Sequence, residues 1–124
     1  MRIIIESIPI SEMRPEAGPT VGDWFEDPEG NIRIKVADTG VETDYFLVAI
    51  HELAEWMLCR VQGVPEKAVD EFDCAFTGEG EPGDEPNAPY RDQHCLATAI
   101  ERSMCAMLGL SWKEYDDRCN GVLQ

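Results

Sequence analysis

The chain has 124 residues, 44% of them apolar, a size and composition that predict one domain with a single hydrophobic core. Its 25 Asp and Glu residues outnumber 10 Lys and Arg and give a net charge of -15, which disfavours direct binding to nucleic acids or anionic membranes. The same charge suits a cationic partner, such as a metal ion, a basic peptide or a basic protein groove that normally receives DNA.

The N-terminus and the cysteines indicate a reduced, cytoplasmic protein. The first residues, MRIIIESIPI, lack the cleavage site of a signal peptide and are typical of a short strand, and no run of about 18 apolar residues follows. Five cysteines form an odd set without a C-x-x-C pair, so we expect free, mostly buried thiols. They are Cys59, Cys74, Cys95, Cys105 and Cys119.

Residues 1–40 predict a small antiparallel sheet of about three strands. Residues 2–10 are rich in isoleucine, and two further extended runs flank the turn DPEGN. In the second of these runs Ile32, Ile34 and Val36 alternate with polar residues, which indicates a hairpin with one buried face.

After residue 40 the spacing of the apolar residues changes from every second residue, as in a strand, to the three-and-four spacing of a helix. Phe46, Ile50, Leu53 and Met57 recur at the spacing of one helical face, which predicts a helix over residues 42–62 with this face in the core. Further apolar residues flank this face, namely Leu47, Ala54, Leu58 and Val61.

Four further segments complete the expected architecture. A second helix is predicted over residues 64–77, and the glycine- and proline-rich residues 78–89 predict a loop or lid. A third helix is expected over residues 90–109. A short one is expected over 111–119, where Ser111 and Glu114 have the spacing of a capping box. The fold class is therefore α+β, a small sheet followed by three to four helices, with all 124 residues in a single domain.

The third helix has two distinct faces. One is mainly apolar and the other mainly polar. The first face carries Leu96, Ile100, Ser103 and Met107, and the second carries His94, Thr98, Glu101 and Cys105.

The first helix also contains His51, Glu52 and Glu55, in the pattern H-E-x-x-E. His51 and Glu55 are four residues apart, so their side chains project from the same face and can bind one metal ion. The pattern matches the H-E-x-x-H zinc helix with glutamate in place of the second histidine, and zinc accepts carboxylate oxygen as well as imidazole nitrogen. Glu52 points toward a different flank of the helix.

A third ligand has to come from another element. His94 is the only other histidine, and it lies near the start of the third helix, directly after the loop. Asp73 is a further candidate because it falls in the apolar stripe of the second helix, where an unpaired carboxylate is costly to bury. Glu101, on the same face as His94, is expected to orient that histidine.

This arrangement predicts a divalent metal cofactor, zinc first, held by His51, Glu55 and His94. A metal so bound lowers the pKa of a water molecule to about 7, and Glu52 is the expected general base. Hydrolysis of a peptide or another amide is the corresponding reaction, and a peptide or protein is the expected substrate.

Two other functions are compatible with the residues. Glu52 and Glu55, followed by Asp70 and Asp73, resemble the paired carboxylate motifs of the all-α nucleoside triphosphate pyrophosphohydrolases, which bind magnesium. The strong negative charge also suits a non-enzymatic decoy that presents carboxylates to a basic partner protein.

The segments HELAEWMLC, AVDEFDCAF, DEPNAPYRDQH and AIERSMCAMLGLSWKEY are similar to a group of small bacteriophage and prophage proteins without an assigned activity. The similarity covers about the last two thirds of the chain and implies the cytoplasm of an infected host cell. More distantly, the sheet followed by an H-E helix resembles the minimal zincins, which are metallopeptidase-like domains. That resemblance implies a zincin-like fold with His51 as ligand and Glu52 as general base, whereas Glu55 departs from the histidine of the zincin motif.

Overall fold

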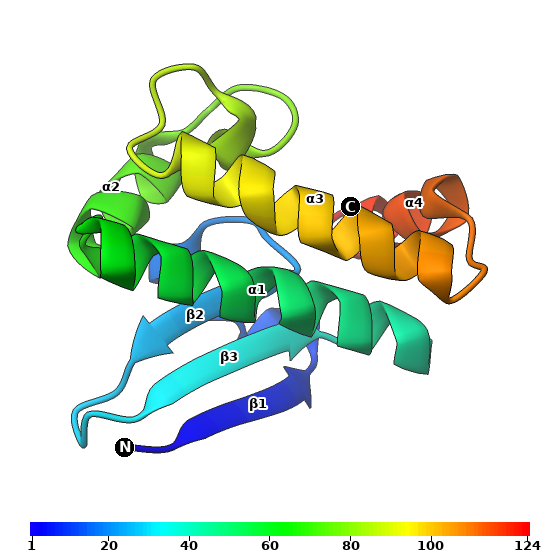
Figure 1. Ribbon diagram of the computed structural model, residues 1–124, viewed down its shortest axis with the longest axis horizontal. Coiled ribbons are helices and arrows are strands. Elements are labelled where there is room, and N and C mark those ends of the chain that lie inside the picture. The colour runs from blue at the N-terminus through cyan, green and yellow to red at the C-terminus, as the bar shows by residue number, and fades with distance from the viewer.

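Three strands and then four helices follow one another along the chain in a computed structural model that describes residues 1–124 (Figure 1). The strands are β1 (Ile3–Ile8), β2 (Gly22–Glu26) and β3 (Ile32–Ala37). The helices are α1 (Glu42–Gln62), α2 (Glu66–Ala75), α3 (Arg91–Met107) and α4 (Trp112–Val122). The expected α+β fold, a three-stranded sheet followed by helices, is confirmed.

The sheet is mixed, not antiparallel throughout as the sequence predicted. Its strand order is β1-β3-β2, with β2 and β3 forming the expected antiparallel hairpin and β1 lying parallel to β3. Residues 9–21 cross from β1 to β2 and leave room for β3 between them. The apolar alternation of a strand determines which face is buried, but it carries no information on the neighbouring strand or its direction.

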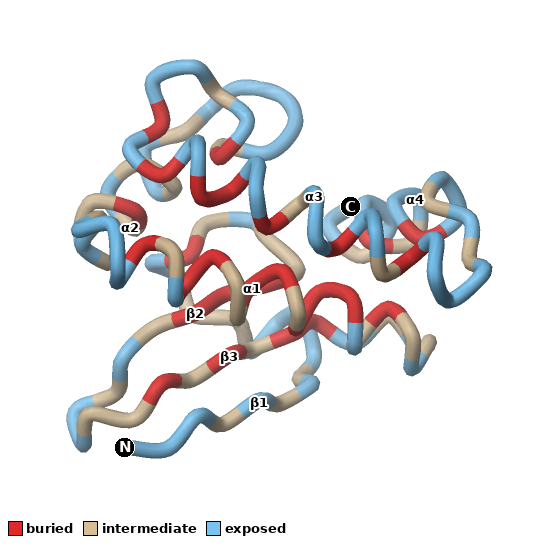
Figure 2. The backbone as a smooth tube through the Cα atoms, in the orientation of Figure 1, coloured by how far each residue is buried: buried red, intermediate tan, exposed pale blue.

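The core lies between the sheet and α1. Ile32, Ile34 and Val36 of β3 are almost completely buried, as predicted, and pack with Leu47 and Cys59 of α1. Figure 2 shows this buried layer running along β3 and α1, whereas β1 is more exposed. α3 lies beside α1, and Figure 1 shows the two helices running in opposite directions.

The inward face of α1 is not the predicted one. Phe46 and Met57 are exposed, whereas Leu47, Val48 and Trp56 are buried together with the polar residues of the H-E-x-x-E pattern. Apolar residues occur on both sides of this helix, so periodicity alone selected the wrong side.

On α3 the mainly polar face is the buried one. Leu96, Ile100 and Met107 are exposed, and the buried face contains His94 and Glu101 together with small side chains such as Ala97 and Cys105. Most of the buried polar residues on both helices have a hydrogen-bond or ion-pair partner on another element.

The remaining helices lie close to their expected ranges. α2 spans fewer residues than the predicted segment 64–77, and α4 continues to Val122. Ser111 caps α4 by accepting a hydrogen bond from the backbone N–H of Glu114 at 3.2 Å, as the capping box predicted. None of the helices combines the length and the apolar character that crossing a bilayer requires.

Candidate metal centre

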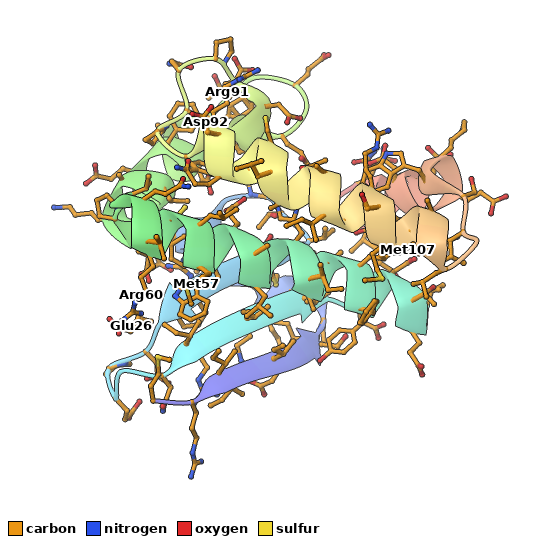
Figure 3. All side chains as sticks on the ribbon, viewed as in Figure 1. Glu26, Met57, Arg60, Arg91, Asp92 and Met107 are labelled. Carbon is orange, nitrogen blue, oxygen red and sulfur yellow. The ribbon has the colours of Figure 1, made fainter.

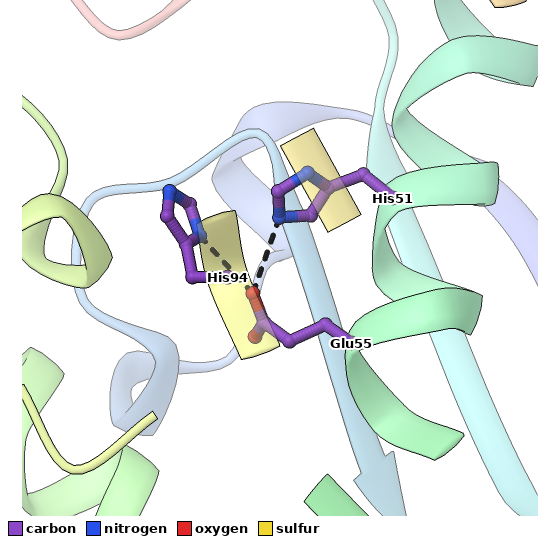
Figure 4. A group of neighbouring side chains, drawn as sticks. All are labelled: His51, Glu55 and His94. Carbon is purple, nitrogen blue, oxygen red and sulfur yellow. Dashed lines mark hydrogen bonds and ion pairs between the residues drawn. The ribbon is translucent and has the colours of Figure 1, made fainter. Parts of the chain in front are cut away.

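Two adjacent helices bring a glutamate and two histidines together at the centre of the molecule. α1 supplies His51 and Glu55 one turn apart, and α3 supplies His94. One carboxylate oxygen of Glu55, Oε2, lies 3.1 Å from His51 Nε2 and 3.1 Å from His94 Nδ1 (Figure 4). All three side chains are buried.

The spacing of these three atoms fits one small cation. His51 Nε2, Glu55 Oε2 and His94 Nδ1 all lie within 4.8 Å of one another. A tetrahedral zinc site with bonds of ~2.0–2.1 Å separates its ligand atoms by about 3.3 Å. The two 3.1 Å distances are therefore close to those of a ligand set, and small side-chain movements would complete the site.

Each histidine has a carboxylate partner on the nitrogen that faces away from this centre. His51 Nδ1 lies 2.8 Å from Glu101 Oε1, and His94 Nε2 lies 2.9 Å from Glu81 Oε2 and 3.2 Å from Asp84 Oδ1. An outer carboxylate that accepts the N–H proton fixes the tautomer, so that the inner nitrogen can present its lone pair to a metal. Glu101 thus orients His51, not His94 as the sequence predicted.

The carboxylates determine the protonation state of the metal-free site. Burial alone would lower the pKa of His51, but hydrogen bonds to Glu101 and Glu55 outweigh it and hold this pKa well above its ordinary value. The pKa of His94 rises to about 10 because Glu55 and Glu81 outweigh its burial. Burial would raise the pKa of Glu55, but the two histidines lower it to about 2. Without a metal, two imidazolium rings therefore flank one carboxylate.

Glu52 is the buried carboxylate without a hydrogen bond. Only 9% of the residue is exposed, and a Cβ at Gly22 of β2 would lie 2.5 Å from Glu52 Oε1, so its side chain needs the glycine. Burial and the neighbouring charge of Glu55 raise the pKa of Glu52 well above its ordinary value. The sequence placed Glu52 on a different flank, but it lines the same cavity as His51 and Glu55.

Asp73 does not join the ligand group. Its carboxylate accepts a hydrogen bond from the Tyr90 hydroxyl, and it lines the cavity at some remove from the histidines. Burial raises the pKa of Asp73 to about 7, against the lowering effect of the Tyr90 hydrogen bond. The predicted fourth ligand is therefore a cavity wall residue in this structure.

Residues 78–89 cover the α3 side of the site. A short 3-10 turn at Pro82–Asp84 packs onto α3, and a Cβ at Gly83 would lie 2.4 Å from His94 Cγ. Glu81, which precedes this turn, and Asp84, its last residue, both contact His94. The loop expected as a lid thus supplies two carboxylates to the site.

The cavity next to these side chains is large and strongly acidic. It has a volume of about 840 Å³, and nine carboxylates and one arginine, Arg102, line it. Arg14 adds positive charge at one wall, where it contacts Asp23 at 2.6 Å and Asp70 at 2.9 Å. The lining therefore has a large excess of acidic over basic groups.

Sequence reasoning missed four contributors to the site. Their contacts join different elements or loops of the chain, and no spacing within a helix or strand indicates them. Trp24 of β2 donates its indole N–H to Glu55 Oε1 at 3.0 Å, and Tyr115 of α4 donates its hydroxyl to Glu101. Glu81 and Asp84 belong to an acidic loop that reads as an ordinary surface connection.

The structure brings together the three side chains predicted as ligands, and their role as ligands stays a prediction. The resemblances to small phage proteins and to minimal zincins also stay predictions. In comparisons with known proteins, no family model, no curated protein and no solved structure matches this chain.

Proposed function

We propose that the chain binds one divalent transition metal, zinc first, through His51, Glu55 and His94. The observation that carries this proposal is that both histidines converge on Glu55 Oε2 while a carboxylate occupies the opposite nitrogen of each ring. Metal-ligating histidines characteristically have such outer partners. A buried histidine that serves only packing does not need a second histidine on the same oxygen.

Charge balance supports the exchange of protons for a metal. In the metal-free chain both histidines hold an extra proton, because the surrounding carboxylates raise their pKa values. Release of these two protons and uptake of one dication leave the charge of the buried site unchanged. The low-dielectric interior therefore does not oppose the replacement on electrostatic grounds.

We further propose metal-dependent hydrolysis with Glu52 as the general base. The metal would acidify a water molecule, and Glu52 would accept its proton and pass it to the leaving group. Glu52 suits this role because it lines the cavity, has no competing hydrogen bond and is almost fully buried. A dication bound beside Glu52 would lower the raised pKa of this carboxyl and free it to act as a base.

The acidic cavity favours a cationic or neutral substrate. Nine carboxylates around a volume of about 840 Å³ would repel a triphosphate, and Asp70, needed for the magnesium motif, is already paired with Arg14. A peptide with basic side chains matches the sign of the lining. We therefore prefer peptide or amide hydrolysis to nucleotide pyrophosphate hydrolysis.

The proposal is tested first by metal content. Plasma mass spectrometry of the untagged protein, purified with added zinc, is expected to find about one ion per chain. His51→Ala and His94→Ala should each lose it, whereas Glu71→Gln on exposed α2 should retain it. Absence of metal after incubation with zinc, manganese or nickel would contradict the metal site.

The hydrolase step is tested separately with Glu52→Gln, a substitution of similar size. This variant should keep the metal but lose cleavage of a library of lysine- and arginine-containing peptides. A metal-loaded wild-type protein that cleaves none of them, or a Glu52→Gln variant that cleaves them equally well, would reject the catalytic role and leave the metal site standing.

A further inference from the structure

The outward faces of α1 and α3 carry large apolar side chains that nothing in the chain covers. We call these residues the outer seam. Their exposed fractions range from 43% for Phe46 to 75% for Val61. The seam consists of Phe46, Met57 and Val61 on α1 and Leu96, Ile100 and Met107 on α3. Figure 3 shows Met57 and Met107 on their helices.

The spacing on both helices is that of a helix bundle interface. The seam residues of α1 lie 11 and 4 residues apart (46 to 57 to 61), and those of α3 lie 4 and 7 apart (96 to 100 to 107), so each set shares one face of its helix. This is the spacing of a seam that packs against another helix. α1 and α3 lie side by side, and Glu55 of one contacts His94 of the other, so the two rows run next to each other.

The outer seam also avoids carboxylates. In α1 every Asp and Glu after Glu42 is buried on the inner face, namely Asp44, Glu52 and Glu55. In α3 Glu101 is the only carboxylate after Asp92, and it too is buried. A chain with a net charge of -15 thus keeps one broad helical surface free of negative side chains.

We propose that the outer seam is the interface of a two-fold symmetric dimer, in which α1 and α3 of one chain pack against α1 and α3 of a second copy. The buried layer would then be a four-helix interface of the usual kind. The apolar pattern that predicted burial of Phe46 and Met57 would be satisfied between chains instead of within one.

Area and charge both favour a second copy as the occupant. The six side chains, 43–75% exposed, form an apolar patch on the order of several hundred Å², comparable with the ~300–600 Å² patches that mark interaction sites and a large part of the ~800 Å² per partner of a standard interface. Two chains of charge -15 repel each other, and the outer seam is the surface where they can meet without opposing carboxylates. Antiparallel pairing of the two α1 helices would place Arg60 near the partner's Glu42.

The test is the mass of the untagged protein in solution between about 1 and 300 µM, by light scattering and analytical ultracentrifugation. The wild type is expected to be a dimer of twice 13.9 kDa. Ile100→Glu and Met57→Glu should each weaken dimerisation more than about tenfold, because each would bury a charge at the interface. Both positions are exposed in the single chain, so both variants should keep the wild-type circular dichroism spectrum.

Ile3→Glu is the matched control. Ile3 is 45% exposed, as Ile100 is 46% exposed, but it lies on the edge strand β1. This variant should dimerise like the wild type. A wild type that is monomeric at 300 µM would overturn the proposal and indicate that the outer seam binds a different protein. A dimer that survives Ile100→Glu, or that Ile3→Glu dissociates, would overturn it as well.

Discussion

At the scale of single residues, Glu55 is the side chain on which the site depends most. One of its oxygens accepts hydrogen bonds from both histidines and the other accepts the indole N–H of Trp24. A histidine at this position, as in the zincin motif, could not make these three contacts at once because it has two nitrogen atoms. The departure from H-E-x-x-H is therefore consistent with the neighbours that the fold supplies.

Glu55→Gln is expected to lower the pKa of both histidines in the metal-free protein. Their pKa values are raised largely because a carboxylate faces them, and the neutral amide removes that charge. Titration of the histidine ring resonances by NMR measures this directly. The same variant should bind zinc at least about tenfold more weakly. Unchanged histidine pKa values would show that Glu55 does not help to raise them.

Asp73→Asn should stabilise the protein at high pH and not at low pH. The pKa of Asp73 is about 7 in the fold against an ordinary 3.8, so folding favours its protonated form. This contribution to stability is complete below about pH 4 and is lost as pH rises through 7. Asparagine keeps an acceptor for the Tyr90 hydroxyl without the charge.

We expect Asp73→Asn to exceed the wild type by about 1–3 kcal/mol in free energy of unfolding at pH 8 and to match it near pH 4. Urea unfolding at both pH values measures the difference. The control is Glu71→Gln on the exposed side of α2. A gain of equal size at both pH values would refute the titration argument.

At the scale of elements, residues 78–89 hold the outer side of the site through close backbone contact. Gly83 lies against the ring of His94, and an added Cβ would have to displace the loop. Gly83→Ala is expected to destabilise the fold by about 1–3 kcal/mol and to separate Glu81 and Asp84 from His94. Hydrogen exchange of residues 79–89 should increase.

Gly121→Ala is the matched control for the loop substitution. Gly121 lies in α4, and a Cβ there would contact nothing within 4 Å. Alanine is favoured over glycine within a helix, so this variant should be neutral or slightly stabilised. Equal effects of the two substitutions would contradict the role of the close approach at Gly83.

The elements themselves were largely predictable from the sequence, but their inward faces were not. The range of α1, the hairpin of β2 and β3 and the cap at Ser111 follow from local patterns, and the structure agrees with all three. The burial of Asp44 depends on Arg118, 74 residues away, whose Nε lies 2.7 Å from Asp44 Oδ2. Periodicity within one helix contains no information about such a partner.

The site, too, was predictable only within a single helix. His51 and Glu55 are four residues apart on one helix, so their proximity follows from helix geometry. His94 meets these two residues only because α1 packs against α3. Its partner Glu81 comes from the loop, and Tyr115, the partner of Glu101, comes from α4. The site thus follows from helix geometry within α1 and from tertiary structure beyond it.

At the scale of the whole molecule, metal binding should appear as stability. An ion that binds only the folded chain stabilises it by about 2.7 kcal/mol at a concentration 100 times its dissociation constant. We expect zinc to raise the melting temperature by several degrees and a chelator to reverse the effect, as scanning calorimetry would show. His94→Ala should abolish the shift. A shift of the same size in that variant would place the bound zinc elsewhere.

The hydrogen bond between Trp24 and Glu55 gives the protein a built-in optical probe. The indole N–H of Trp24 contacts the carboxylate that both histidines share. Indole emission responds to charge in its immediate surroundings, so any change in the ligation or protonation of Glu55 should alter the fluorescence of the unlabelled chain. The Trp24→Phe variant measures the emission of the other two tryptophans, which can then be subtracted. Metal binding at the site can thus be followed in real time without a dye or a substrate.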